Sequence, residues 1–148
     1  MIDSVDRAIL AEYIEDSRQS FREVARKTNV SPGTVAARVA KLEEKGIIQK
    51  YTIQVDHEKL GYDLTVLINV RVMGSPRFFE ESNEVAEMLE PNAIYNTTGD
   101  HDLLIISKFK NRAELSEFTK NLLRLPQVQG TKTQLVLQTI TEDFNKIR

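Results

Sequence analysis

The sequence predicts an α+β protein with two parts: an N-terminal helix-turn-helix and a C-terminal ferredoxin-like domain with the element order βαββαβ. Three observations support this interpretation. Apolar side chains in the first third recur at helical spacing behind three helix-start signals. Beyond residue 63, apolar and polar side chains alternate in short runs that are separated by turns and by two further helical segments. The 148 residues are enough for two small domains.

Three helices are expected in the first third, each with its own capping residue. Asp3 followed by Asp6 marks the first start, and Ser20-Phe21-Arg22-Glu23 fits a capping box at the second. Ser31-Pro32 begins the third, because Ser accepts from free N–H groups and Pro at the first position needs no donor. Lys45-Gly46 ends it, since Gly readily adopts the left-handed backbone. The expected buried stripes are Val5, Ile9, Tyr13 and Ile14; Phe21, Val24, Ala25 and Thr28; and Val35, Val39 and Leu42.

The link between the second and third helices is only two residues long. Asn29 tolerates the left-handed backbone better than most residues, and Val30 is expected to fill the space between the helices. Two capped helices joined by so tight a turn are typical of a helix-turn-helix. Ile47-Ile48 and residues 51–53, which follow the third helix, are expected to be extended.

The C-terminal domain is expected to form a four-stranded antiparallel sheet with both helices on one face. Its other face then needs a cover, and a second copy of the chain is the simplest one, so a homodimer is expected. The expected elements are a strand at 64–72, a helix from Ser75-Pro76 to Leu89, strands at 94–98 and 103–109 around a turn at 99–102, a helix at 111–123 and a last strand at 128–137.

Charge is distributed unevenly along the chain. The net charge is −2, which alone argues against a nucleic-acid partner. Between Ser17 and Lys50, however, eight basic and three acidic side chains leave a net charge of +5, so the remaining residues carry −7. This distribution is typical of a DNA-binding module joined to a domain that does not bind DNA. Chance clustering of solvated Lys and Arg is the alternative.

The third helix has a face that the expected core does not use. This face is expected to enter a DNA major groove, where Arg38 would read a guanine edge or bind a phosphate. Ser31 at the helix start and Arg22 on the second helix are placed to contact phosphates. An ordinary helical hairpin with a solvated basic face is the alternative. The candidate DNA-binding residues are Arg22, Ser31, Gly33, Thr34, Ala37, Arg38 and Lys41.

No catalytic or metal-binding residues are expected. The chain has no Cys, its two His are far apart in sequence, and it has no Gly-rich phosphate loop. A reproducible turnover or a stoichiometric metal would revive the enzyme alternative. The N-terminus does not resemble a signal peptide, and no apolar run approaches the ~20 residues that span a bilayer. We therefore expect a cytoplasmic protein with no membrane partner.

Several stretches, in the same order along nearly the whole chain, resemble the Lrp/AsnC (feast/famine) family of transcriptional regulators. They are residues 5–10 (VDRAIL), 16–18 (DSR), 42–48 (LEEKGII), 59–62 (KLGY), 98–103 (TGDHDL), 125–128 (LPQV) and 131–133 (TKT). The resemblance implies a winged helix-turn-helix at residues 1–50, a strand linker at 51–61, and a ferredoxin-like effector-binding and oligomerisation domain with a C-terminal tail at 62–148.

The resemblance also implies partners: double-stranded DNA, a homodimer formed through the sheet, often a higher oligomer such as an octamer, and an amino-acid effector bound between dimers. No cofactor is implied. Asp100 or Asp102 would bind the effector's ammonium, and Thr hydroxyls and turn N–H groups its carboxylate. His101 stands where the family often has an aromatic residue such as Tyr. Carried over to this chain, the effector-binding residues are Gly99, Asp100, His101, Asp102, Thr131 and Thr133.

Other functions share these features. Asp in a turn often binds only its own backbone, and Thr is common in strands, so the effector residues also have a purely structural interpretation. An architectural DNA-binding protein with this fold and no effector remains an alternative. It would show little sequence preference and a steep salt dependence. A ligand-sensing module that binds no DNA is disfavoured by the basic segment around the third helix.

Overall fold

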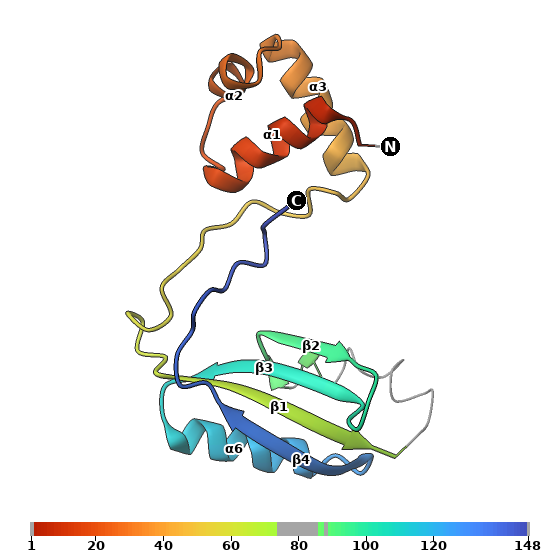
Figure 1. Ribbon diagram of the computed structural model, residues 1–148, viewed down its shortest axis with the longest axis vertical. Coiled ribbons are helices and arrows are strands. Elements are labelled where there is room, and N and C mark those ends of the chain that lie inside the picture. Colours follow the sequence, from red (N-terminus) through yellow and green to blue (C-terminus); the bar gives the residue numbers. More distant parts are fainter. Residues whose placement is uncertain (1, 74–85, 88, 148) are drawn as a thin grey trace. The chain divides into compact units, whose positions relative to one another are not determined.

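The computed structural model describes residues 2–73, 86–87 and 89–147. The chain forms two compact units, one made of Met1–Gln54 with Thr141–Arg148 and the other of Val55–Ile140 (Figure 1). The domain boundaries expected after residues 50 and 61 stay predictions. No helix in the described part of the chain is long and apolar enough to cross a membrane.

The N-terminal unit contains the three expected helices, α1 (Ser4–Glu15), α2 (Phe21–Thr28) and α3 (Pro32–Glu44). Their caps are those that the sequence predicts. Asp3 and Ser20 each form a complete capping box with the third helical residue, and the Ser31 side chain accepts from the Thr34 N–H. At the end of α3, Gly46 has a φ of 66°, in the left-handed region.

The core of this unit lies where the three helices meet, and Val5, Val30 and Ile48 pack against it. Two residues of the expected stripes, Ile14 and Phe21, are 43% and 45% exposed. Ile14 is the next-to-last residue of α1 and Phe21 is the first residue of α2, so each lies at an end of its helix. The buried cluster consists of Ile9, Tyr13, Val24, Ala25, Val35 and Val39.

Residues 45–63, all of them described, contain no assigned strand. The extended conformation expected at Ile47-Ile48 is wrong: these residues lie in the turn that ends α3, because both of their N–H groups donate to the Leu42 carbonyl. The segment expected to be extended at 51–53 pairs with no strand in the described part of the chain. Within residues 45–63, the apolar side chains of Ile53 and Leu60 are 78% and 57% exposed.

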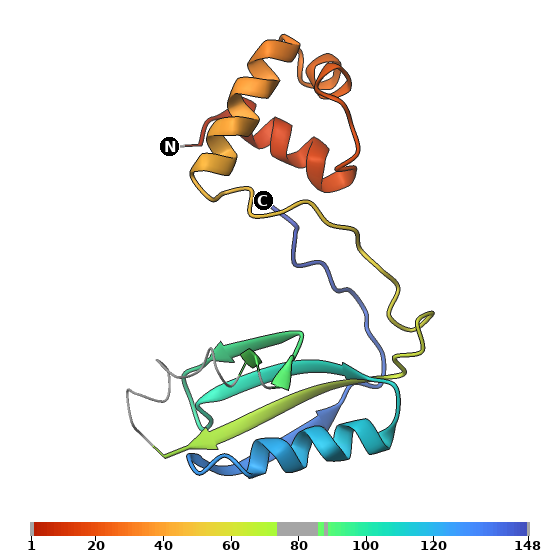
Figure 2. The same cartoon turned by 180° about the vertical axis from the view of Figure 1, so that it is seen from behind.

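The C-terminal unit is built on a four-stranded sheet whose order is β2-β3-β1-β4, with every neighbouring pair antiparallel. The strands are β1 (Leu64–Val72), β2 (Ala93–Asn96), β3 (Leu103–Phe109) and β4 (Val128–Leu135). Helix α6 (Arg112–Leu123) lies on one face, as both ribbon views show (Figures 1 and 2). This order is that of a ferredoxin-like domain. Of the helix expected from Ser75-Pro76, only residues 86–87 and 89 are described, and they are helical.

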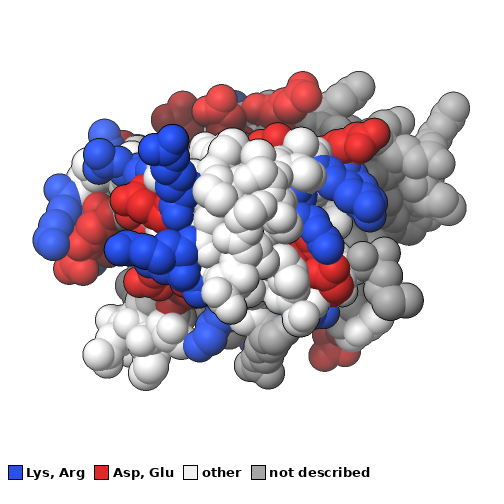
Figure 3. Space-filling model, turned by 90° about the horizontal axis from the view of Figure 1, so that it is seen from above, with Lys and Arg blue, Asp and Glu red and all other residues white. Residues whose placement is uncertain are grey.

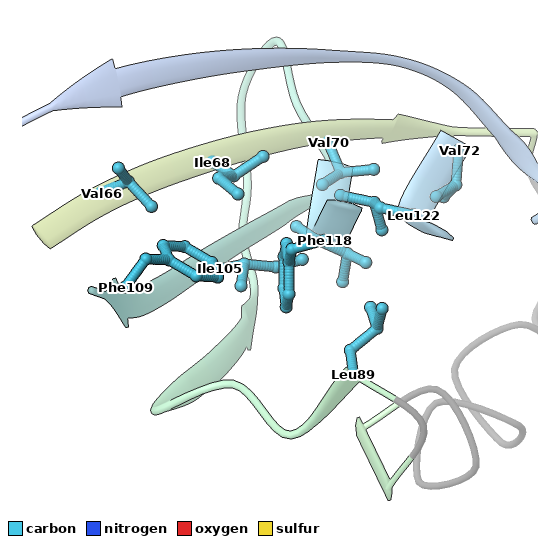
Figure 4. Close-up of a cluster of buried hydrophobic side chains, with 10 residues drawn as sticks. Val66, Ile68, Val70, Val72, Leu89, Ile105, Phe109, Phe118 and Leu122 are labelled. Carbon is cyan, nitrogen blue, oxygen red and sulfur yellow. The ribbon is translucent and has the colours of Figure 1, made fainter. Parts of the chain in front are cut away.

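The alternation in β1 sorts its side chains onto the two faces of the sheet. Ile68 and Val70 lie opposite Ile105 and Leu103 and point into the core (Figure 4). Helix α6 closes this core with Phe118 and Leu122; the rings of Phe118 and Phe109 meet edge to face with centroids 5.1 Å apart. On the opposite face, Leu67, Leu104 and Ile106 are only half-buried, and Tyr95 is 44% exposed.

Candidate functional site

The connection between α2 and α3 adopts the geometry that its sequence predicts. Asn29 caps α2 with a φ of 56° and a ψ of 41°, the left-handed conformation. The Val30 N–H donates to the Ala25 carbonyl at 3.1 Å, and the Val30 side chain packs against the core. The chain therefore turns sharply while its apolar residue holds the two helices together, which is the arrangement of a helix-turn-helix.

Helix α3 presents a surface of small side chains opposite its buried stripe. Gly33, Ala37 and Lys41 are exposed and follow one another at intervals of four residues, so they share one face. A Cβ added at Gly33 would meet only the Ser31 Oγ, at 3.8 Å. Small side chains allow the helix backbone to come close to a partner surface, as it must within a major groove.

The start of α3 is held by its own cap. The Ser31 Oγ accepts from the Thr34 N–H at 3.0 Å and shares a hydrogen bond of 2.9 Å with the Thr34 Oγ1. Each hydroxyl therefore has a hydrogen-bond partner at the N-terminal end of α3. There Ser31 is exposed and Thr34 is half-buried. The positive end of the helix dipole adds to the attraction that this end would have for a phosphate.

Arg38 points toward α1. Its Nη1 donates to the Asp3 Oδ2 at 2.5 Å and to the Asp6 Oδ1 at 3.1 Å. The hydrogen bonds to Asp3 and Asp6 raise the pKa of Arg38. The pKa of Asp3 is lowered, mainly by the hydrogen bond from the Asp6 N–H and then by the one from Arg38. Asp6 is buried, with a side chain only 10% exposed. The residue expected to face a DNA groove is thus paired within the domain.

The other basic side chains of this unit have different surroundings. Arg22 and Arg26 on α2 are exposed, whereas the Lys27 Nζ pairs with the Glu12 Oε2 at 2.8 Å. Looking onto the N-terminal unit, Lys and Arg side chains lie on both sides of an uncharged strip (Figure 3). Asp and Glu side chains lie among these Lys and Arg side chains in the same view. Cationic side chains beside an uncharged strip suit a surface that enters a groove between two phosphate backbones.

Tyr51 anchors the segment that follows α3, a role that sequence reasoning missed. Its hydroxyl donates to the Glu43 Oε1 at 2.8 Å, and its ring packs edge to face on Tyr13 at 6.3 Å between centroids. Burial and the Glu43 carboxylate raise the pKa of Tyr51 to about 12. No local sequence signal marks this contact, because its partners lie on two other helices.

In the C-terminal unit, Asp102 joins the turn to β1. The Asp102 N–H donates to the Val70 carbonyl at 2.9 Å, and its Oδ2 accepts from the Val72 N–H at 2.8 Å. Gly99 begins this turn with a φ of 112°, which favours glycine. One carboxylate oxygen of Asp102 is therefore already used in holding the turn.

Asp100 and His101 are at the tip of the same turn. Asp100 is exposed and His101 half-buried, and their carbonyls accept from Arg71 and Thr97 at 3.2 Å and 3.1 Å. Arg71 is a residue that sequence reasoning missed, since only strand pairing brings it beside the turn. The Arg71 guanidinium from β1 and the Asp100 carboxylate of the turn therefore lie in the same region, and these are the two charges that recognise a zwitterion.

The two threonines that complete the expected effector site are on β4. Thr131 and Thr133 lie opposite Val70 and Ile68, so their side chains share the face that α6 covers. Strand β1 separates β4 from β3, which places β4 about 10 Å from the strand that the turn precedes. Within one chain the threonines and the turn are therefore separated by a strand.

The described residues contain no group of three or more His, Cys, Asp or Glu side chains that could hold a metal ion. The turn at residues 99–102 brings His101 near two carboxylates in sequence, but Asp102 is directed to the β1 backbone.

Two family profiles match the chain. The profile described as winged helix-turn-helix DNA-binding covers residues 2–49, and the one described as Lrp/AsnC ligand binding domain covers residues 65–145. An uncharacterized HTH-type transcriptional regulator of Pyrococcus furiosus is 40% identical, over 97% of this chain and 96% of its own length. The HTH-type transcriptional regulator FL11 of Pyrococcus horikoshii is 33% identical, over 95% of this chain and 93% of its own.

Solved structures show the same architecture. The structure of E. coli AsnC is 28% identical, covers 99% of each chain and superposes with a TM-score of 0.87. A transcriptional regulator of Neisseria meningitidis, solved in complex with L-Met, gives a TM-score of 0.89 over 99% of this chain and 97% of its own. At 23% identity, that second likeness shows the fold alone.

Proposed function

Since the chain belongs to the Lrp/AsnC family of transcriptional regulators, we propose that it binds specific DNA sites through α3 and responds to an amino acid bound by its C-terminal domain. It is a transcriptional regulator with a helix-turn-helix DNA-binding domain and a ligand-binding domain. No catalytic role and no cofactor form part of the proposal. Its place is the cytoplasm, together with the DNA that it controls.

The observation that carries the DNA interface is the exposed row of small residues on α3, opposite the buried stripe. Gly33, Thr34 and Ala37 enter the major groove, where close approach of the backbone brings side chains to base edges. Ser31 at the helix start, Arg22 and Lys41 contact phosphates, which set the position of the helix on the duplex. The net charge of +5 between residues 17 and 50 supports this division of roles.

The experiment that tests DNA recognition is selection of duplexes from a random pool by the full chain, followed by affinity measurements at two salt concentrations. A regulator should prefer the enriched duplex over random DNA by ~10³-fold or more. Little preference combined with a steep salt dependence would instead support the architectural alternative. Pseudo-palindromic sites with half-sites about one helical turn apart, or a multiple of it, are expected for a dimer.

The dimer is proposed from the uncovered face of the sheet. Leu67, Leu104, Ile106 and Tyr95 are apolar side chains that remain partly exposed on the face that α6 does not cover. A second copy of the chain placed on this face would remove them from water. Assembly of dimers into a higher oligomer such as an octamer rests on the resemblance to the family.

The effector is proposed to be an amino acid at the 99–102 turn. The ligand-binding profile supports a ligand, and the charges at the turn support its class. The Asp100 carboxylate is placed to bind an ammonium, while Arg71 and the turn N–H groups at Gly99 and His101 bind a carboxylate. Because β1 separates Thr131 and Thr133 from the turn, these threonines complete the site from a neighbouring chain.

A thermal-shift screen of the full chain against the twenty amino acids tests the effector site. A ligand at ~100 times its dissociation constant should stabilise the protein by ~2.7 kcal/mol. Asp100→Asn should abolish this shift while leaving the unliganded midpoint unchanged, because the exposed Asp100 uses only its backbone carbonyl in the structure. If no amino acid shifts the wild type, the effector proposal fails and DNA binding without an effector becomes the better interpretation.

A further inference from the structure

Arg38 is the one candidate DNA-binding residue whose side chain the structure commits to a network of ion pairs within its own unit. We propose that Arg38 is a positioning residue: its guanidinium holds α3 against the start of α1 and does not read a base. Base recognition then falls to Gly33, Thr34 and Ala37 on the exposed face of α3, while Lys41 binds phosphate. This inference rests on the proposed DNA binding, and it identifies the contact that holds α3 in the orientation needed to bind DNA.

The hydrogen bonds around Arg38 form a closed set. Asp3 and Asp6 make the capping box of α1: the Asp3 Oδ1 accepts from the Asp6 N–H at 2.9 Å, and the Asp6 Oδ2 accepts from the Asp3 N–H at 3.1 Å. The second oxygen of each carboxylate accepts from the Arg38 Nη1. All four carboxylate oxygens of Asp3 and Asp6 therefore accept a hydrogen bond, and the Arg38 Nη1 donates to two of these oxygens.

The charges make it unfavourable for Arg38 to leave this site. The Asp6 side chain is only 10% exposed, so loss of its cation would leave a largely buried carboxylate with one unpaired oxygen. The Asp3 carboxylate would also lose its ion pair with Arg38. The unpaired charge of the largely buried Asp6 and the lost ion pair of Asp3 would offset the contact that Arg38 could gain on the DNA.

The position of Arg38 in α3 explains what the network does. Arg38 is four residues after Thr34 and three before Lys41, so it lies beside the face assigned to the groove but is turned toward α1. A link from the middle of α3 to the first turn of α1 sets the rotation of α3 about its own axis. That rotation decides whether Gly33 and Ala37 face outward.

The test compares Arg38→Gln, Asp6→Asn and the double variant with Lys41→Gln as the matched control on the same helix. The probes are a duplex enriched from a random pool by the wild-type chain and a random-sequence duplex. The quantity measured is the ratio of the two affinities and its dependence on salt, at a temperature where circular dichroism shows every variant to be folded. A changed charge near DNA alters the affinities for both duplexes alike, so this effect cancels in the ratio of the two affinities.

A positioning role predicts that Arg38→Gln and Asp6→Asn each lower the ratio by a similar factor, on the order of tenfold, and that the double variant is no worse than either. Neither should change the salt slope of the wild type, because neither side chain binds phosphate. Lys41→Gln should make the salt slope less steep by ~0.9. Repeated selection with Arg38→Gln should show weaker preference at all positions of the site.

A base-reading role predicts a different pattern, and observing it would overturn the proposal. Arg38→Gln would then relax preference at one base pair of each half-site, and Asp6→Asn would leave the ratio unchanged or raise it by releasing the guanidinium. Asp3→Asn is the milder variant if Asp6→Asn unfolds, since Asn still caps a helix. It should lower the ratio in the same direction as Arg38→Gln.

Failure of the proposed function would look different again. If selection enriches no duplex, sequence-specific regulation is wrong. The salt slope on random DNA and the coupling of Arg38→Gln with Asp6→Asn in thermal unfolding would still decide the role of Arg38. An unchanged slope with strong coupling supports positioning, whereas a less steep slope with additive effects refutes it.

Discussion

The Asp102 Oδ2 accepts a hydrogen bond from the Val72 N–H at 2.8 Å, which ties the turn before β3 to the end of β1. Asp102→Ala should lower the free energy of unfolding of the C-terminal unit by about 1–3 kcal/mol, because a partly buried N–H loses its charged acceptor. Asp102→Asn keeps an acceptor and should recover much of the loss. Chemical denaturation of the unliganded protein checks both variants. Unchanged stability of Asp102→Ala would leave this residue without the structural role assigned to it.

Gly33 offers a test of close approach between α3 and DNA. Gly33→Ala should not destabilise the fold, since the added Cβ has room and Ala favours a helix over Gly by up to about 1 kcal/mol. Its affinity for the selected duplex should nevertheless fall, because the methyl group lies on the surface that enters the groove. Gly130→Ala makes the same chemical change on β4, where a Cβ meets nothing within 4 Å, and should leave DNA affinity unchanged. Wild-type affinity of Gly33→Ala would mean that this end of α3 stays away from the bases.

The N-terminal unit should be sensitive to acid. Hydrogen bonds from the Asp6 N–H, from the Lys27 side chain and from the Ser20 N–H are the main causes that lower the pKa of Asp3, Glu12 and Glu23, respectively. A carboxylate whose pKa is lowered on folding stabilises the folded protein at pH values above the ordinary pKa of the group. That ordinary pKa is 3.8 for Asp and 4.5 for Glu. That stabilisation is lost as the pH falls through the lowered values.

Denaturation monitored by the NMR signals of α1 and α2 between neutral pH and pH 3 should therefore show stability falling at the acid end. Glu12→Gln and Lys27→Gln should each make this fall less steep by a similar amount, because they remove the same ion pair from either side. If both variants keep the wild-type pH dependence, the pair does not contribute to folding.

Leu67 tests the face of the sheet that α6 leaves uncovered. Leu67→Lys should shift the protein from dimer to monomer, since it places a charge in the centre of the proposed interface. Leu123→Lys is the matched control, because Leu123 is 49% exposed on α6, in the layer on the opposite side of the sheet. Size-exclusion chromatography with light scattering distinguishes the two masses. A dimer that survives Leu67→Lys, or dissociates with Leu123→Lys, would place the interface elsewhere.

Much of the fold could be predicted because its signals are local. A capping box such as Ser20 with Glu23 joins residues three apart, and the left-handed Asn29 acts on its own backbone. The alternation in β1 needs only the two-residue period of a strand. The exposure of Ile14 and Phe21 could not be predicted this way, since periodicity identifies the apolar face of a helix but not which positions along that face are covered.

The sequence by itself determined the helix starts, the turn, the alternation of the strands and the presence of a basic segment. Only the tertiary structure decided which side chains meet. Arg38 is 35 and 32 residues from its partners Asp3 and Asp6, and Arg71 is 29 residues from Asp100. Such contacts arise from the packing of whole helices and strands, so the residues next to each partner in the sequence do not predict them. The physical reason is that a charged side chain pairs with whatever charge the fold brings within a few ångströms, and sequence spacing does not report that distance.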